Sequence, residues 1–275
     1  MNAVAAAGAA PAAARSSALL AAASLARREV VRFFRQPWRI AGAAGSPLLF
    51  WLLIGSGLSS SFRLPGGPAG LDYREYFFPG TVALVVLFAA IFATISTIED
   101  RAQGFLQGVL VAPVPRAAIV GGKVLGGAAL AWLQGLPFLA LAPFAGVALT
   151  VRSALAAAGV LALLAIGLAG VGLAFAWRVD SVQGFHAVMN LLLVPMWLLS
   201  GAFFPLDGAP RWLAALMRVN PMTYGVAALR RALYLGGAPL GPALPPFGTA
   251  LAATALVAAA GFLAALLASR GARVD

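Results

Sequence analysis

The sequence predicts an all-α membrane protein with six transmembrane helices, and three observations support this fold class. First, 62% of the 275 residues are hydrophobic and only 10% are charged, whereas soluble domains carry about 45–50% apolar and about 25% charged residues. Second, the mean hydropathy is +0.94. Third, the charges fall in short clusters that separate six long uncharged runs. A water-soluble enzyme is therefore excluded. The excess of 19 basic over 8 acidic residues indicates a lipid bilayer as partner rather than nucleic acid.

The N-terminal region divides into a tail and an amphipathic helix. Residues 1–16 are rich in Ala, Gly and Pro and are predicted to be a disordered tail in front of a single transmembrane domain, 17–275. Over 17–36, helical spacing places Leu19, Ala23, Ala26, Val30, Phe33 and Phe34 on one side and Arg28, Arg32 and Arg35 on the other. The pattern predicts an interfacial helix that ends before Pro37.

The six uncharged runs are each long enough to cross a bilayer, whose core of about 30 Å requires about 20 helical residues. They cover residues 40–62, 76–98, 124–151, 153–177, 181–206 and 232–269. The last run is too long for one helix, and the Gly and Pro residues between 236 and 246 interrupt it. The sixth span is therefore predicted at 247–268.

The basic residues also predict how the spans are oriented. An even number of spans places both termini on one side of the membrane. With that side inside, 12 Lys and Arg residues lie in inner segments and 7 in outer ones. Positive residues favour the cytoplasmic side, so both termini are predicted to be cytoplasmic in a multi-pass inner-membrane protein.

The outer segment 203–231 is too long and too apolar for a simple loop. Trp212, Leu213, Leu216 and Met217 recur there at helical spacing. We expect short re-entrant helices that lie in or dip into the outer interface.

Several kinds of chemistry lack their usual residues. There is no Cys and only one His, so a zinc site is excluded. All eight acidic residues lie at span ends, in loops or at the terminus, whereas ion-coupled carriers usually hold a carboxylate within the membrane. The segment Gly121-Gly122-Lys123 is followed by Val124 rather than Ser or Thr, so it is not a phosphate-binding loop. The chain is therefore predicted not to be an enzyme and to hold no cofactor of its own.

A membrane protein of this kind can still be driven by an external ATPase, which would require a docking surface on the inner side. Segment 98–116 is the candidate: a charged cluster opens a short helical stretch, and Pro113 and Pro115 end it before the chain re-enters the membrane.

This segment resembles the signature region of the ABC-type-2 exporter permeases, which has an acidic-Arg-x-x-Gly start, an Ala-Pro-x-x-Arg centre and a Gly-Lys end. The matching residues are Glu99, Arg101, Gly104, Ala112, Pro113, Arg116, Gly122 and Lys123. Two further matches are the basic N-terminal helix that ends at Arg35-Gln36-Pro37-Trp38, and Ser200 to Pro205 followed by Asn220-Pro221-Met222-Thr223-Tyr224 and Arg230.

The resemblance implies a six-helix permease domain that pairs with a second copy or a related permease and with separate ABC ATPase subunits, which would bind ATP and Mg. It implies ATPase coupling by Glu99, Asp100, Arg101, Gly104, Leu106, Pro113, Arg116, Arg28, Arg32 and Arg35. It further implies an outer gate at Phe203, Phe204, Pro205, Asn220, Pro221 and Tyr224. The cargo of such permeases includes drugs, lipids, polysaccharides and other amphiphiles.

Other interpretations remain open at this stage. Gln134, His186 and Asn190 are candidates for a translocation path, but the sequence favours hydrogen bonds between helices for them. The arginines of the N-terminal helix can anchor to lipid headgroups and also dock a partner. A membrane scaffold that anchors an enzyme or assembly factor without transport is the main alternative, and an ion-coupled carrier is a third.

Overall fold

The computed structural model describes residues 10–35, 37–58, 71–206, 209–235 and 245–271, with the side chains of 10–17 and 37–44 excepted. Every regular element in these ranges is helical, which confirms the all-α class. The elements are α1 (Ala10–Phe34), α2 (Pro37–Leu58), α3 (Tyr73–Ala93), α4 (Ile95–Ala102), α5 (Phe105–Val111), α6 (Arg116–Ala140), η1 (Ala142–Ala145), α7 (Val151–Ala176), α8 (Val182–Trp197), η2 (Leu198–Ala202), α9 (Arg211–Val219), α10 (Pro221–Leu233) and α11 (Phe247–Arg270).

Five helices in the described ranges are long and apolar enough to cross a membrane. They are Tyr73–Ala102, Arg116–Ala140, Val151–Ala176, Val182–Ala202 and Phe247–Arg270, and each overlaps one of the second to sixth predicted spans. The first predicted span corresponds to α2, whose described apolar stretch, Gly45–Leu58, is shorter than the others. The end of that run, 59–62, and the interruption at 236–244 lie outside the described residues.

Three predicted boundaries are wrong. The predicted third span reaches residue 151, but α6 ends at Ala140, where Pro143 and Gly146, with a φ of +91°, take the chain into η1 and a turn. Helix α1 begins at Ala10 rather than Ser17, because the end of the predicted tail is rich in Ala, the residue with the highest helix propensity; residues 1–9 lie outside the described ranges. Helix α6 begins at Arg116, eight residues before the predicted start of the third span at 124. A charge at Lys123 does not end this helix, because the side chain finds acidic partners inside the fold.

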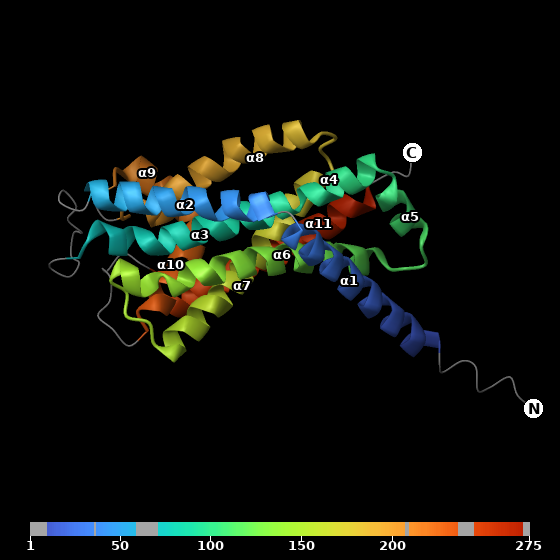
Figure 1. Cartoon of the computed structure of the whole chain (residues 1–275), viewed down its shortest axis with the longest axis horizontal. Coiled ribbons are helices and arrows are strands. Elements are labelled where there is room, and N and C mark those ends of the chain that lie inside the picture. The colour runs from blue at the N-terminus through green and yellow to red at the C-terminus, as the bar shows by residue number, and fades with distance from the viewer. Residues whose placement is uncertain (1–9, 36, 59–70, 207–208, 236–244, 272–275) are drawn as a thin grey trace, which may run out of the picture.

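The bundle is built around α3, whose side chains from Phe77 to Ile91 are mostly buried. Helices α2, α6 and α7 surround it, and α11 packs on α7. Figure 1 shows that α4 and α5 lie at one end of the long axis, together with the start of α1 and the end of α11, while α9 lies at the opposite end. Helix α8 runs along the side of the bundle and keeps large apolar side chains such as Leu191 exposed.

Helices α7 and α11 approach each other through glycines. A Cβ atom added to Gly170 would lie 2.5 Å from the carbonyl carbon of Gly261, and one added to Gly261 would lie 2.4 Å from the carbonyl oxygen of Gly167. These are backbone atoms that cannot rotate away. Small residues of this kind allow close helix packing in membranes.

We expect Gly261→Leu to destabilise the protein by about 1–3 kcal/mol, the usual effect of overpacking, because α7 and α11 must separate. Thermal unfolding in detergent measures the change. Gly248→Leu on the same helix is the matched control, since nothing lies within 4 Å of its added Cβ. Equal unfolding temperatures for the two variants would contradict the prediction.

Candidate functional site

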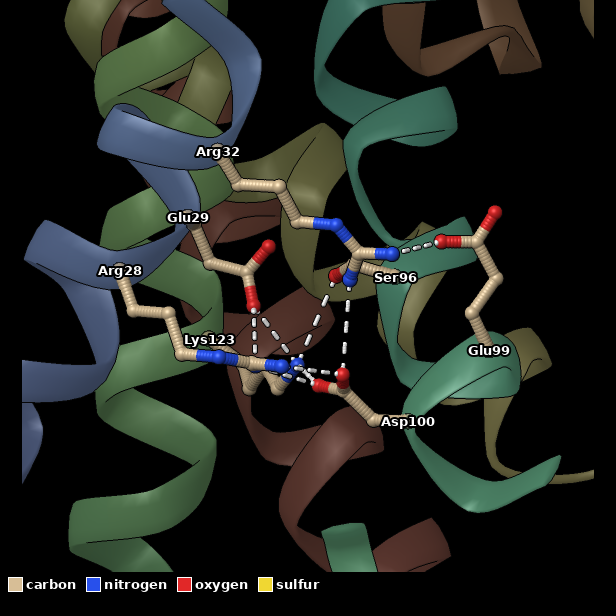
Figure 2. Close-up of polar contacts among 7 residues, drawn as sticks. All are labelled: Arg28, Glu29, Arg32, Ser96, Glu99, Asp100 and Lys123. Atoms are coloured by element: carbon tan, nitrogen blue, oxygen red, sulfur yellow. Dashed lines mark hydrogen bonds and ion pairs between the residues drawn. The ribbon is translucent and has the colours of Figure 1, made fainter. Parts of the chain in front are cut away.

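A cluster of charged side chains joins α1, α4 and α6 inside the protein (Figure 2). The ammonium group of Lys123 on α6 lies 2.7 Å from Oε1 of Glu29 on α1 and donates a hydrogen bond to Asp100 on α4. Their exposed fractions are 4%, 5% and 0%, respectively. Helix α1 is therefore held against α4 and α6, which follow it by more than 60 residues, by one buried group of charges.

Two arginines of α1 complete this cluster, which we call the ion network: Arg28, Glu29, Arg32, Glu99, Asp100 and Lys123. Arg28 donates two hydrogen bonds, of 2.8 and 2.7 Å, to the two carboxylate oxygens of Asp100. Arg32 lies 2.6 Å from Oε2 of Glu99 and 3.5 Å from Oδ1 of Asp100. The hydrogen bond with Asp100 raises the pKa of Arg28, so this guanidinium is charged at any physiological pH.

The ion network contains three cations and three anions, so its formal charge is zero. Each member compensates the desolvation of its neighbours, which is a requirement for charges inside a protein. The close approach of α1 to α6 makes these contacts possible: a Cβ added to Gly122 would lie 2.7 Å from the carbonyl oxygen of Ala22. Sequence reasoning matched Lys123 to the Gly-Lys end of the family signature but gave it no role in the site. Asp100 was among the predicted coupling residues, whereas nothing in the local sequence marked Glu29 as its neighbour in a cluster.

The ion network also changes the predicted role of the N-terminal helix. Arg28 and Arg32 point into the protein toward Asp100 and Glu99, whereas Leu19 and Phe34 are exposed. Arg35 is exposed and stays outside the network. The face of α1 that the sequence suggested for headgroups is therefore largely occupied by intramolecular ion pairs.

The predicted coupling segment folds into two short helices, α4 and α5, that meet at Gly104. This glycine has a φ of +75°, in the left-handed region, and nothing lies within 4 Å of an added Cβ. Leu106 anchors α5 with an exposed fraction of 2%, while Pro113 is exposed. Arg28 links the two helices, because its guanidinium also lies 3.9 Å from the centre of the Phe105 ring.

Two further residues of the coupling segment bind distant parts of the chain. Arg101 donates hydrogen bonds to the carbonyl oxygens of Trp177 and Val179, between α7 and α8, and lies 3.4 Å from Asp180. Arg116 donates to the carbonyl oxygen of Ser269 near the end of α11. The coupling segment is thus joined directly to α1, α6, the α7–α8 connection and α11.

A groove of about 500 Å³ lies between α1 and α5. Its lining is apolar or small: Ala21, Ser24, Leu25, Gly104, Phe105, Gly108, Val109, Ala112, Val114 and Ile119. The ion network lies beside this groove, since Arg28 contacts Phe105.

At the opposite end of the bundle, the chain after α8 folds back through η2, α9 and α10. The helical spacing predicted around Trp212 is confirmed by α9. Asn220 caps α10 by accepting a 3.0 Å hydrogen bond from the amide of Met222, and its side chain donates one of 2.6 Å to the carbonyl oxygen of Met196. The Tyr224 hydroxyl donates to the carbonyl oxygen of Arg218. These bonds hold α10 against α8 and α9.

The predicted gate residues differ in how far they are buried in the structure. Phe203 packs between Phe77 and Trp197, with ring centres 4.9 and 4.7 Å away. Phe204 and Pro205 are partly buried beside it, whereas Pro221 is exposed at the start of α10. The structure brings Phe203 and Asn220 to the same end of α8.

Comparison with known proteins decides the family. The sequence profile of the family described as ABC-2 type transporter matches residues 21–234, most of the chain. The chain belongs to this family. The resemblance inferred from the three sequence motifs is confirmed. The chain is therefore a multi-pass transport permease, and membership of an ABC family implies an ATPase partner.

Relatives of this ABC-2 permease carry related names. The protein ycf38 of Cyanophora paradoxa, named as a transport permease, is 27% identical over 75% of this chain and 71% of its own length. The inner membrane transport permease YadH of Escherichia coli is 27% identical over 66% and 70%. Nodulation protein J of Rhizobium meliloti is 28% identical over 70% and 72%.

The candidate path residues of the ABC-2 permease are not gathered at one point. Gln134 lines a cavity of about 520 Å³ between α1, α2, α3 and α6, and its side-chain oxygen is buried without a hydrogen-bond partner in the described part of the chain. His186 on α8 packs against Phe92 with the two rings tilted and their centres 4.7 Å apart, and Phe92 lines the same cavity. Asn190 is exposed on α8. Phe92 therefore separates Gln134 from the α8 residues.

Proposed function

We propose that this ABC-2 permease is the membrane subunit of an ATP-driven exporter that moves an amphiphilic cargo outward, such as a drug-like molecule, a lipid or a polysaccharide. ATP and Mg bind to a separate ATPase subunit, and a second copy or a related permease completes the pathway. The protein lies in the inner membrane, and both termini are on its cytoplasmic side. The observation that carries the proposal is the ion network, which holds α1 against α4 and α6 next to an open apolar groove.

The groove between α1 and α5 is the docking surface for the ATPase in this proposal. It is wide and apolar, and the absent side chains of Gly104 and Gly108 leave space for a protruding partner residue. ATP-driven closure of the ATPase would press on α5. Arg28 joins α5 to α4 and α1, and Arg101 joins α4 to the α7–α8 connection. A displacement of α5 would therefore move α1, α4 and the α7–α8 connection together. A pre-existing balance between inward-open and outward-open states would shift.

The comparisons support the export proposal at the level of the family only. The relatives are named as permeases or as a nodulation protein, and YadH is named as an inner-membrane protein. The start of α1 and the end of α11 lie at the same end of the bundle as α4 and α5 (Figure 1), which is consistent with cytoplasmic termini near the docking surface.

We expect Gly108→Trp to weaken ATPase binding by at least about tenfold, equivalent to about 1.4 kcal/mol, because the indole fills the groove. Co-purification of the permease with its candidate ATPase, followed by titration of the ATPase, measures the change. ATPase activity of the complex should fall in parallel.

Gly159→Trp on α7 is the matched control, because it too is an exposed helical glycine with nothing within 4 Å of its added Cβ. It should leave ATPase binding unchanged. If both variants bind the ATPase like the unmodified chain, the groove is not the docking surface; if the unmodified chain binds no ATPase, the exporter proposal fails.

A further inference from the structure

A buried arginine on α10 holds the end of η2 against α3. Arg230 has an exposed fraction of 3%. One terminal nitrogen of its guanidinium donates hydrogen bonds to the carbonyl oxygens of Tyr76, at 3.1 Å, and Gly201, at 3.2 Å. The guanidinium carbon also lies 4.2 Å from the centre of the Tyr76 ring. Arg230 thus contacts α3 and η2 at once.

The backbone at and just after η2 presents two carbonyl oxygens to hydrogen-bond donors on α3 and α10. Gly201 has a φ of +80°, so the chain turns sharply out of the helix at this residue. Its carbonyl oxygen accepts a second hydrogen bond, of 2.9 Å, from the Tyr76 hydroxyl. Two residues later, the carbonyl oxygen of Phe203 accepts one of 3.0 Å from the Tyr73 hydroxyl. Donors from α3 and α10 therefore hold the backbone that leads from α8 to the predicted gate.

The partners of Arg230 differ from those of the cations in the ion network. Each cation of the ion network lies within 4 Å of a carboxylate, whereas in the described part of the chain no ion pair joins Arg230 to a carboxylate. Its Nε atom is buried without a hydrogen-bond partner there. A buried cation held only by neutral groups is costly, and within membrane proteins such residues usually serve a function. Neutral partners also release a cation more readily than carboxylates do.

We propose that Arg230 and Tyr76 form a catch that keeps the outer gate closed by binding the carbonyl oxygen of Gly201. Release of this carbonyl frees η2 and Phe203 from α3, and the exit opens. Arg230 acts here as a positioning residue, because it holds the gate backbone rather than the cargo. The inference rests on the proposed export function and adds the contact that must break in each transport cycle.

The absence of Cys from the chain allows a direct test. Leu206→Cys introduces a single thiol just after the gate, and its rate of modification by a maleimide is measured on the purified permease in nanodiscs, which expose both faces. Tyr76→Phe removes only the hydroxyl. We expect it to raise the modification rate about two- to tenfold, the effect of one buried hydrogen bond on an equilibrium. Arg230→Gln should raise the modification rate further. Arg230→Lys should return the rate most of the way to that of the chain with Leu206→Cys alone.

Two controls separate a catch from general loosening. Tyr234→Phe removes a 2.6 Å hydrogen bond to Glu75 that does not involve η2, so the modification rate of the thiol introduced at position 206 should not change. A thiol introduced by Ala142→Cys, at a position that is fully buried in η1, should remain unmodified in every variant. An unchanged rate in both Tyr76→Phe and Arg230→Gln would overturn the catch, as would equal labelling at position 142. The assay contains no ATPase and no cargo, so its outcome is independent of whether an ATPase complex forms.

Discussion

Lys123→Met is expected to lower the free energy of unfolding by about 3 kcal/mol. Removal of one partner from a buried ion pair typically destabilises a protein by about 3–5 kcal/mol, because an uncompensated charge remains inside. The lower end applies here, since Arg28 and Arg32 still neutralise Asp100. Glu29 is affected most, because its remaining cation, Arg28, lies 3.7 Å away. Unfolding by sodium dodecyl sulfate in mixed micelles provides the measurement.

The double variant Lys123→Met with Glu29→Gln should be more stable than Lys123→Met alone, because the second change removes the orphaned charge. The difference defines the coupling between the two residues. Arg178→Met is the control for loss of an exposed cation, and its effect should lie within about 0.5 kcal/mol. If Lys123→Met is no more harmful than Arg178→Met, the ion network does not stabilise the fold.

Arg28→Met is expected to impair the coupling between the ATPase and the permease more strongly than it lowers the stability of the fold. It removes both hydrogen bonds to Asp100 and the contact with Phe105. We expect a stability loss of about 1.5 kcal/mol, the low end for hydrogen bonds to charged groups, since one third of the side chain is exposed. The ATPase should still bind the groove, but its activity should no longer respond to the permease.

Arg28→Lys separates charge from geometry. Lysine keeps the positive charge but cannot reproduce the two-pronged contact of a guanidinium with a carboxylate. We therefore expect stability close to that of the unmodified chain together with partial loss of ATPase stimulation. Full stimulation in Arg28→Met would show that the link between α5 and α1 carries no signal. Arg27→Met, which removes an exposed cation one position away, is the matched control.

Hydropathy and helical spacing predicted much of the fold. Uncharged runs identified the five long spans within a few residues at most ends, because backbone groups in a bilayer are satisfied only by long helices or closed barrels. Pro37 marked the end of α1 correctly, and the spacing of Trp212 and Leu216 predicted α9. Local patterns were sufficient in each case because local geometry alone decides these features.

Long-range pairing could not be predicted in the same way. Lys123 was interpreted as a boundary charge because a single Lys in an apolar region is costly without a partner, and its partners lie 94 and 23 residues away. The same holds for Arg230 and Tyr76, which are 154 residues apart. Their significance depends on which helices become neighbours, and the composition of each segment contains no trace of this.

The placement of Lys123 has a consequence for biosynthesis. When the ribosome has made the first 122 residues, the emerging protein already contains Arg28, Arg32, Glu29, Glu99 and Asp100, which leaves the unfinished site with one negative charge in excess. The arrival of Lys123 neutralises it. The contacts that hold the N-terminal helix are therefore balanced in charge only once the start of α6, which carries Lys123, has been synthesised.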